Sequence, residues 1–198
     1  MVASLPEWIF DNRIEITGAL LGVLYIFFSV RQNILTWPVG LLSSVFYIFV
    51  FLKSGFYAYM SLQVYYVIIS IYGWFYWLKG SRDGDDTKKV KKVTNRLTVL
   101  LVFIAMILYG TILLILLKFT DSPVPFIDSL ISALSIVATW MLSRKILENW
   151  LVWIFVDVVS IGLFILRDLW PTAILYMIYA IFAISGFMKW KKTIAQNG

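Results

Sequence analysis

Long apolar stretches, interrupted by short polar connections, follow one another along almost the whole chain. A bilayer core of about 30 Å needs roughly 20 helical residues to cross it. Seven stretches come close to that length, at residues 16–31, 35–53, 56–78, 97–118, 126–143, 149–166 and 170–189. The pattern predicts an all-α integral membrane protein with seven transmembrane helices and almost no chain left for a soluble domain.

The sequence also matches itself, without a gap, when it is shifted by 113 residues. The identical pairs are 31/144, 37/150, 51/164, 62/175, 66/179, 73/186, 77/190 and 79/192, and they include Trp, Tyr, Gly and Arg. Spans one to three then correspond to spans five to seven. We expect a three-helix repeat at residues 1–79, a basic linker with a connector helix at 80–125, and a second three-helix repeat at 126–198.

Corresponding spans lie four apart, an even number, so the two repeats are predicted to cross the membrane in the same direction. Parallel repeats of this kind are typical of transporters that bind their substrate near the midplane, between the repeats.

The distribution of basic residues predicts how the chain is oriented in the membrane. The chain carries a net charge of +6, and 13 of its 17 basic residues fall on one predicted side of the membrane. The positive-inside rule then predicts an outer N-terminus and a cytoplasmic C-terminus. The basic run from Lys79 to Arg96 is interpreted as a cytoplasmic linker near anionic lipid rather than as a nucleic-acid site. Residues 1–13 lack a basic n-region and a small-residue cleavage site, so we expect no removable signal peptide and expect the first span to direct insertion.

Composition excludes several kinds of chemistry. The chain is 61% hydrophobic, and it contains neither cysteine nor histidine. Disulfides, thiolate catalysis and the commonest metal ligands are therefore excluded, and a zinc enzyme with them. We expect no catalytic residues, no metal and no cofactor.

An aspartate lies within the sixth apolar stretch. Asp157 follows Trp150 and Trp153 at helical spacing, which places the carboxylate and both indoles on one stripe. It lies about eight residues, or about 12 Å, from the start of its span. A charge at that depth costs roughly 2.5 to 3.5 kcal/mol on insertion scales, so it usually faces the bundle interior and has a function. The alternative is a structural pairing with arginine or an amide.

Two other spans carry comparable stripes. Gln63 and Tyr66 lie on one face of span three, and Tyr179 lies on span seven. Aromatic residues near span ends usually belong to interfacial belts, which is our interpretation of Trp74, Trp140 and Trp190. Trp153 is deeper and favours a ligand role.

Three polar residues near span ends have weaker interpretations. Asp128, in PFIDS, is expected to cap the fifth helix from Ser129 onward, and the alternative is a contact at the outer mouth. Asn33, in the first connection, is a candidate for a cytoplasmic vestibule, and Glu148 suits the N-terminus of the sixth helix.

A carboxylate among aromatic rings fits a flat, cationic solute. The carboxylate offsets the positive charge, and aromatic faces attract it by cation–π contact. Amides and hydroxyls such as those of Gln63, Tyr66 and Tyr179 would orient its polar edges.

Several stretches resemble the PnuC family of bacterial vitamin transporters. They are RQNILTWPVG, the stretch that ends in GWFYW, the segment that contains ENWLVWIFVDVVS, and TAILYMIYAIFAISGFMKWKK. The resemblance implies facilitated uptake of nicotinamide riboside across the inner membrane, made one-way by cytoplasmic phosphorylation. It also implies a seven-helix, three-one-three fold similar to SWEET-type transporters, commonly trimeric, and substrate contacts at Asn33, Gln63, Trp150, Trp153 and Asp157.

The alternatives are a thiamine transporter of the same family, an ion-coupled transporter that uses Asp157, an intramembrane enzyme and a structural subunit. The sequence holds no GxxxxGK[ST] phosphate loop, so ATP hydrolysis is not built in. An enzyme would need a second deep catalytic group beside Asp157, and none is predicted.

Overall fold

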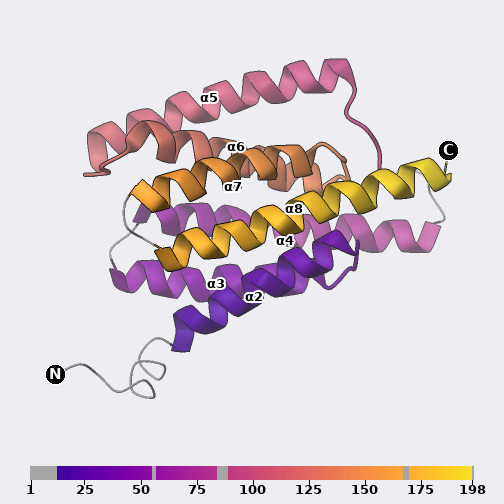
Figure 1. The fold of residues 1–198 in the computed structure, drawn as a ribbon, viewed down its shortest axis with the longest axis horizontal. Helices are drawn as coiled ribbons and strands as arrows, with labels where there is room; N and C mark the ends of the chain where they lie inside the picture. The colour runs from indigo at the N-terminus through magenta and orange to yellow at the C-terminus, as the bar shows by residue number, and fades with distance from the viewer. Residues whose placement is uncertain (1–12, 55–56, 84–88, 167–169, 198) are drawn as a thin grey trace. The chain divides into compact units, whose positions relative to one another are not determined.

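The computed structural model describes residues 13–54, 57–83, 89–166 and 170–197. In these ranges the chain forms seven α-helices, shown in Figure 1, and no strand longer than an isolated bridge. The helices are α2 (Arg13–Val30), α3 (Thr36–Ser54), α4 (Tyr57–Asp83), α5 (Asn95–Phe119), α6 (Pro125–Ser143), α7 (Asn149–Leu166) and α8 (Trp170–Asn197). The predicted all-α class is confirmed. The chain divides after Leu78 into two compact units, which we describe separately.

The observed helix bounds agree closely with the apolar stretches, except at two ends. Helix α4 continues to Asp83 and α8 to Asn197, five and eight residues beyond the predicted ends. Polar residues there continue the helix after the apolar run has stopped. Within the part of the chain that the structure describes, four helices are long and apolar enough to cross a membrane: Asn95–Phe119, Pro125–Ser143, Asn149–Leu166 and Thr172–Gln196. The apolar stretches of α2 and α3, Ile16–Val30 and Thr36–Leu52, are shorter.

In the first unit, α2 and α3 pack through glycines that face tyrosines. A Cβ on Gly40 of α3 would lie 2.6 Å from the ring of Tyr25, which belongs to α2. A Cβ on Gly18 of α2 would lie 3.2 Å from the ring of Tyr47, which belongs to α3. The hydroxyl of Ser43 also donates to the Gly18 carbonyl oxygen at 2.9 Å. Small residues therefore let the two backbones approach closely, as is common between membrane helices.

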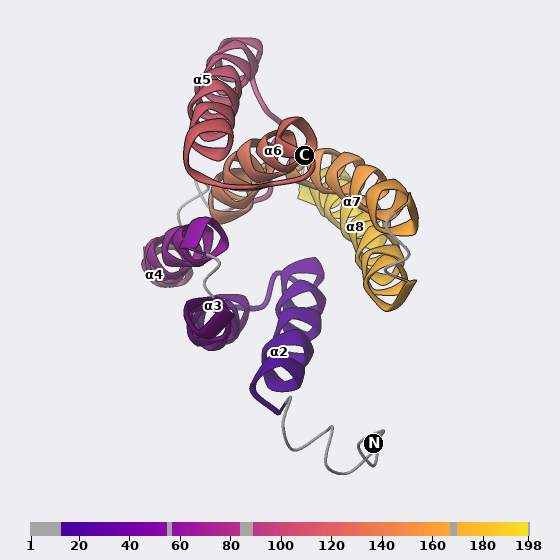
Figure 2. The ribbon, with the colours of Figure 1, turned by 90° about the vertical axis from the view of Figure 1, so that its left-hand side faces the viewer.

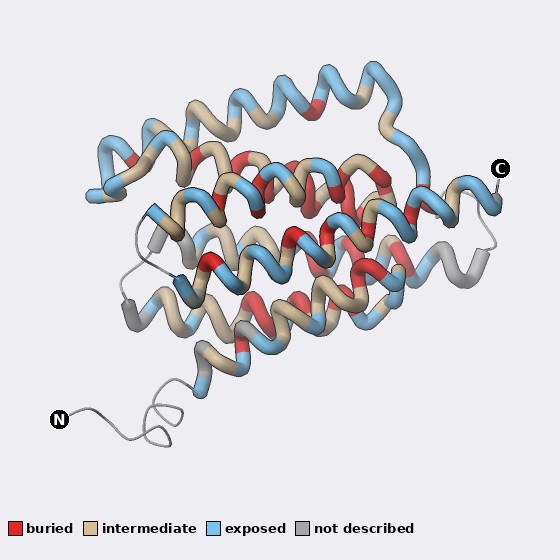
Figure 3. The backbone as a smooth tube through the Cα atoms, in the orientation of Figure 1, coloured by how far each residue is buried: buried red, intermediate tan, exposed pale blue. Residues whose placement is uncertain are grey.

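In the second unit, α5, α6, α7 and α8 pack in chain order, each against the next, as Figure 2 shows. The core joins α5, α6 and the α6–α7 turn through Leu101, Val137, Met141 and Ile146. Figure 3 shows buried residues gathered on α6, whereas α5 is exposed along most of its length.

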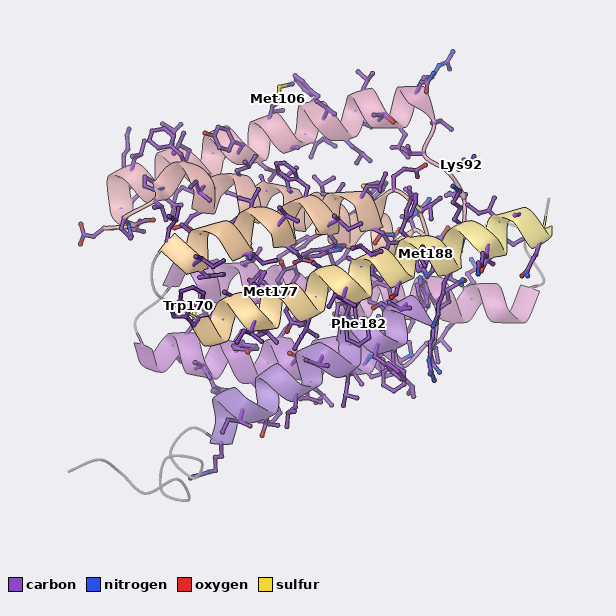
Figure 4. The ribbon with its side chains drawn as sticks, viewed as in Figure 1. Lys92, Met106, Trp170, Met177, Phe182 and Met188 are labelled. Carbon is purple, nitrogen blue, oxygen red and sulfur yellow. The ribbon has the colours of Figure 1, made fainter. Side chains whose placement is uncertain are left out.

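The exposed side chains of α5 and α8 are largely apolar. In Figure 4, Met106 projects outward from α5, and Met177 and Met188 lie along α8. Their exposed fractions are 58%, 40% and 55%. Surfaces this apolar are not stable in water, so they suit contact with lipid or with another membrane helix.

The 113-residue repeat reappears in the backbone. The turns after α2 and α6 each place a residue in the left-handed region, Gln32 at φ 54° and Lys145 at φ 52°. These two positions are 113 residues apart. The hydrogen bonds around them also repeat: the N–H of Asn33 donates to the Phe28 carbonyl oxygen, and that of Ile146 to the Met141 carbonyl oxygen, both at 3.0 Å.

The repeat extends to a tryptophan–glycine contact in each unit. The rings of Trp37 and Trp77 meet edge to face with centroids 5.3 Å apart, and those of Trp150 and Trp190 do so at 5.4 Å. Beneath each first tryptophan lies a glycine, Gly73 in α4 and Gly186 in α8. Thus three of the eight identical pairs found by self-comparison, 37/150, 73/186 and 77/190, form the same packing contact in each unit.

Candidate functional site

Helix α7 carries a buried acidic residue. Asp157 is the ninth residue of this helix and is 2% exposed. Its Oδ2 atom has no hydrogen-bond partner among the described residues. A buried carboxylate oxygen without a partner costs free energy, so its presence on an otherwise apolar helix calls for a functional explanation.

Three further buried atoms on α7 also lack hydrogen-bond partners within the described ranges. They are Nε1 of Trp150, Oγ of Ser160 and Oδ1 of Asn149. The amide nitrogen of Asn149, by contrast, donates to the Ile146 carbonyl oxygen at 2.6 Å. Since Trp150, Asp157 and Ser160 recur at spacings of seven and three, their side chains share one side of α7. That side combines a donor, an acceptor and a hydroxyl.

The structure gives Trp150 a clear packing role. Its ring is 1% exposed and meets Trp190 edge to face, with Gly186 directly beneath it. Trp37 has the same surroundings in the first unit, and its Nε1 atom is likewise buried without a partner. Packing therefore accounts for both tryptophans equally, and substrate contact by Trp150 stays a prediction. Trp153 is half-buried.

Comparison of the two repeats shows which residues of α7 differ from their counterparts in α3. The residues of α3 that correspond to Trp153 and Asp157 are Gly40 and Ser44. Both α3 residues are buried. The carboxylate and its neighbouring indole thus replace small residues at equivalent positions of the same local framework. Because the first unit builds that framework without them, packing of the framework does not require either residue.

Asn33 lies in the first connection and is exposed. Its Oδ1 atom accepts a hydrogen bond from the N–H of Leu35 at 2.9 Å, while its carbonyl oxygen accepts from the hydroxyl of Thr36 at 2.8 Å. These bonds shape the turn that leads into α3. A role for Asn33 in binding stays a prediction beside this structural one.

The remaining predicted residues are half-buried on α4 and α8. Tyr66 lies beside Tyr65, with ring centroids 5.7 Å apart, and Tyr179 meets Tyr176 at the same distance. Gln63 is half-buried on α4. The candidate residues are therefore divided: Trp150, Trp153, Asp157 and Tyr179 belong to the second unit, and the others to the first.

Asp128, near the start of α6, has a role that differs from the predicted cap. Helix α6 begins at Pro125, so the expectation that Asp128 caps it from Ser129 onward is wrong. Asp128 lies within the first turn and accepts a hydrogen bond from the Ser122 hydroxyl at 2.6 Å. The Pro at the first helical position, whose missing N–H needs no partner, allows the earlier start.

Glu148 anchors the end of the basic linker. Its Oε2 atom accepts a hydrogen bond from the N–H of Val93 at 2.8 Å. Next to it, Lys91 pairs with the α6–α7 turn: its N–H donates to the Lys145 carbonyl oxygen at 3.0 Å, and its carbonyl oxygen accepts from Leu147 at 2.9 Å. The linker is thereby fixed to the start of the helix that carries Asp157.

Sequence reasoning missed Ser160 and Asn149. Ser160 stands three residues after Asp157, so helical spacing could have placed it on the same stripe. Asn149 is the first residue of α7, and it is wholly buried. Among the described residues, no group of three or more acidic residues gathers that could hold a metal ion.

Comparison of the sequence with known proteins identifies a family. A family model described as "Nicotinamide mononucleotide transporter" matches residues 12–192. The nicotinamide riboside transporter PnuC of Escherichia coli (strain K12) is 26% identical over 209 residues, covering 93% of this chain and 87% of the relative. The riboflavin/roseoflavin transporter RibM of Streptomyces davaonensis is 27% identical over 194 residues, covering 92% and 87%.

The fold has a solved counterpart. The crystal structure of the vitamin B3 transporter PnuC matches with a TM-score of 0.77 at 24% identity, covering 95% of this chain and 84% of that one. The resemblance read from the tryptophan motifs is confirmed, and so is the expectation of a transporter rather than an enzyme. The chain belongs to the nicotinamide mononucleotide transporter family.

Proposed function

We propose that the protein mediates facilitated uptake of nicotinamide riboside across the bacterial inner membrane. The observation that carries the proposal is the carboxylate of Asp157, 2% exposed on an apolar helix, with an oxygen that lacks a hydrogen-bond partner in the described ranges. An isolated buried carboxylate is stabilised by a cation, and the pyridinium ring of nicotinamide riboside supplies one. The half-buried indole of Trp153, one turn earlier on α7, offers that ring a face.

The carboxylate of Asp157 favours nicotinamide riboside over nicotinamide mononucleotide, the compound in the family description. The mononucleotide adds a phosphate, whose negative charge a buried carboxylate would repel. The riboside has the ring-borne positive charge alone. The names of the E. coli relative and of the PnuC relatives in Neisseria mucosa and Haemophilus influenzae support this choice.

The proposed substrate contacts are Asn33, Gln63, Tyr66, Trp150, Trp153, Asp157 and Tyr179. Gln63 and the tyrosines would meet the hydroxyls and the carboxamide of the solute, since these groups donate and accept hydrogen bonds. Transport runs down the concentration gradient, and phosphorylation in the cytoplasm keeps the product inside. The N-terminus lies outside and the C-terminus in the cytoplasm, as the basic residues favour, and the protein is a homotrimer.

Titration calorimetry of the purified protein tests the proposal. The parent should bind nicotinamide riboside, and Asp157→Asn, which keeps the shape and removes the charge, should weaken binding at least tenfold. Equal affinity in the variant would refute the role of the carboxylate. Thiamine, which also carries a ring-borne positive charge, and riboflavin, which is neutral, are titrated beside it. Tight binding of either one alone would replace the proposed substrate.

Transport into vesicles distinguishes facilitated diffusion from ion coupling. In the second mechanism Asp157 would carry a proton or a sodium ion. Uptake by purified protein in vesicles is measured with and without an imposed ion gradient. Downhill exchange of labelled nicotinamide riboside without a gradient supports facilitated diffusion, whereas uptake that requires the gradient assigns Asp157 to the ion.

A further inference from the structure

The hydroxyl of Ser160 differs from four other buried hydroxyls of the helices. A hydroxyl within a helix usually donates to a backbone carbonyl one turn earlier. Four buried residues of this chain do so: Ser29 to Tyr25, Ser129 to Pro125, Thr139 to Ser135, and Ser143 to Trp140. Ser160 is 1% exposed, and its Oγ atom has no partner among the described residues. Among the described residues, it is the only hydroxyl oxygen that is itself wholly buried and has no partner.

Ser160 lies one helical turn beyond Asp157. Residues three apart on a helix are neighbours, with Cβ atoms about 5–6 Å apart. A hydroxyl so placed could donate to the carboxylate, yet Oδ2 of Asp157 and Oγ of Ser160 both remain without a partner in the described ranges. The two side chains therefore offer separate hydrogen-bonding points on neighbouring turns of α7.

We infer that Ser160 is a second polar contact for the transported solute, next to Asp157. The inference rests on the proposed function and extends it. An ionised carboxylate only accepts hydrogen bonds or meets a cation, whereas a hydroxyl both donates and accepts. The pair fits a solute that carries a cationic ring with an uncharged polar group, such as a carboxamide or a sugar hydroxyl, bonded to it.

The first unit shows that the fold does not need this pair. The positions of α3 equivalent to Asp157 and Ser160 hold Ser44 and Tyr47. Tyr47 packs against Gly18 and stacks on Phe51, with ring centroids 5.7 Å apart. The first unit thus fills the equivalent place with a packing residue, and only the second combines a carboxylate with an unpartnered hydroxyl.

Two serine-to-alanine variants of the full-length protein test the inference. Ser160→Ala removes the unpartnered hydroxyl, and Ser129→Ala, the control, removes a buried hydroxyl that already donates to the Pro125 carbonyl oxygen. Calorimetric titration uses nicotinamide riboside and 1-methylnicotinamide, which keeps the cationic ring and the carboxamide but lacks the sugar. We expect Ser160→Ala to weaken riboside binding about two- to tenfold, the effect of one hydrogen bond, and Ser129→Ala to leave it unchanged.

If Ser160→Ala binds both ligands more weakly, Ser160 contacts the carboxamide, which both ligands carry. If it binds only the riboside more weakly, Ser160 contacts the sugar, which 1-methylnicotinamide lacks. Unchanged affinity for both ligands overturns the inference. The melting temperature gives a separate test, because removal of an unpartnered hydroxyl should leave it unchanged or raise it. A fall of several degrees in Ser160→Ala would make the hydroxyl structural and overturn the inference. If the parent bound neither ligand, the proposed function would fail, and the inference that rests on it would fail with it.

Discussion

Replacement of Gly186 by alanine would place a methyl group against the indole of Trp150. The new Cβ would lie 2.6 Å from the Cδ2 and Cε2 atoms of that ring. Carbon atoms in contact prefer about 3.5–4.0 Å, so the ring would have to move by about 1 Å. It has little room, because Trp150 is 1% exposed and packs against Trp190. Overpacking of this kind costs about 1–3 kcal/mol.

The chain supplies its own controls for this substitution. A Cβ on Gly110 of α5 or Gly162 of α7 would meet no atom within 4 Å. Alanine is favoured over glycine inside a helix by about 1 kcal/mol, a gain that all these variants share. Gly110→Ala and Gly162→Ala should therefore melt higher than the parent, and Gly186→Ala should melt below them by about 2–12 °C, the overpacking cost at about 2–4 °C per kcal/mol.

The assay is thermal unfolding of the detergent-purified protein, followed by the loss of the monodisperse peak in size-exclusion chromatography. Gly73→Ala, which faces Trp37 at 2.5 Å, should behave like Gly186→Ala. Trp150→Phe should restore part of the loss when combined with Gly186→Ala, since the smaller ring leaves room for the methyl group. Equal melting temperatures for Gly186→Ala and Gly162→Ala would refute the packing argument.

Three further substitutions probe separate features. Trp153→Ala should weaken binding of nicotinamide riboside by about 1–2 kcal/mol, because its ring is expected to stack on the cation. The control, Trp74→Ala, changes an exposed tryptophan and should leave binding unchanged when both variants are titrated by calorimetry. Glu148→Ala removes the acceptor for the Val93 N–H and should speed amide hydrogen exchange at residues 91–93, while unchanged exchange would contradict the anchoring role. Lys145→Gly should raise the melting temperature, because φ is 52° there and glycine adopts that conformation without strain; a lower value would contradict this.

The helices could be predicted from the sequence because each apolar stretch is bounded by polar or turn-forming residues. The predicted span 149–166 coincides with α7. Prediction was weakest at Asp83 and Asn197, where the helices continue through polar residues, and a hydropathy pattern does not register helical structure outside the membrane. Asp128 was misassigned because Pro125 starts its helix three residues earlier.

The candidate site could be predicted only in part. Asp157 is conspicuous because charge is rare in an apolar run, and its burial confirms that it faces the protein interior rather than the surface. Ser160 is not conspicuous, since serine is common in such helices and only the structure shows which hydroxyls find a carbonyl oxygen. Similarly, the partner of Glu148 lies 55 residues away in the chain, beyond the reach of local spacing rules.

The two tryptophan–glycine contacts have an evolutionary consequence. No residue larger than glycine fits at 73 or 186 while an indole occupies the space above it, so neither partner can change alone without a loss of stability. Substitutions at 37 and 73 should therefore be inherited together across the family, and so should those at 150 and 186. Within one chain, however, the two pairs lie in separate units and are free to diverge from each other. Because neither partner of a pair can change alone, these four positions should change slowly, and the similarity between the two repeats should persist there after it is lost elsewhere.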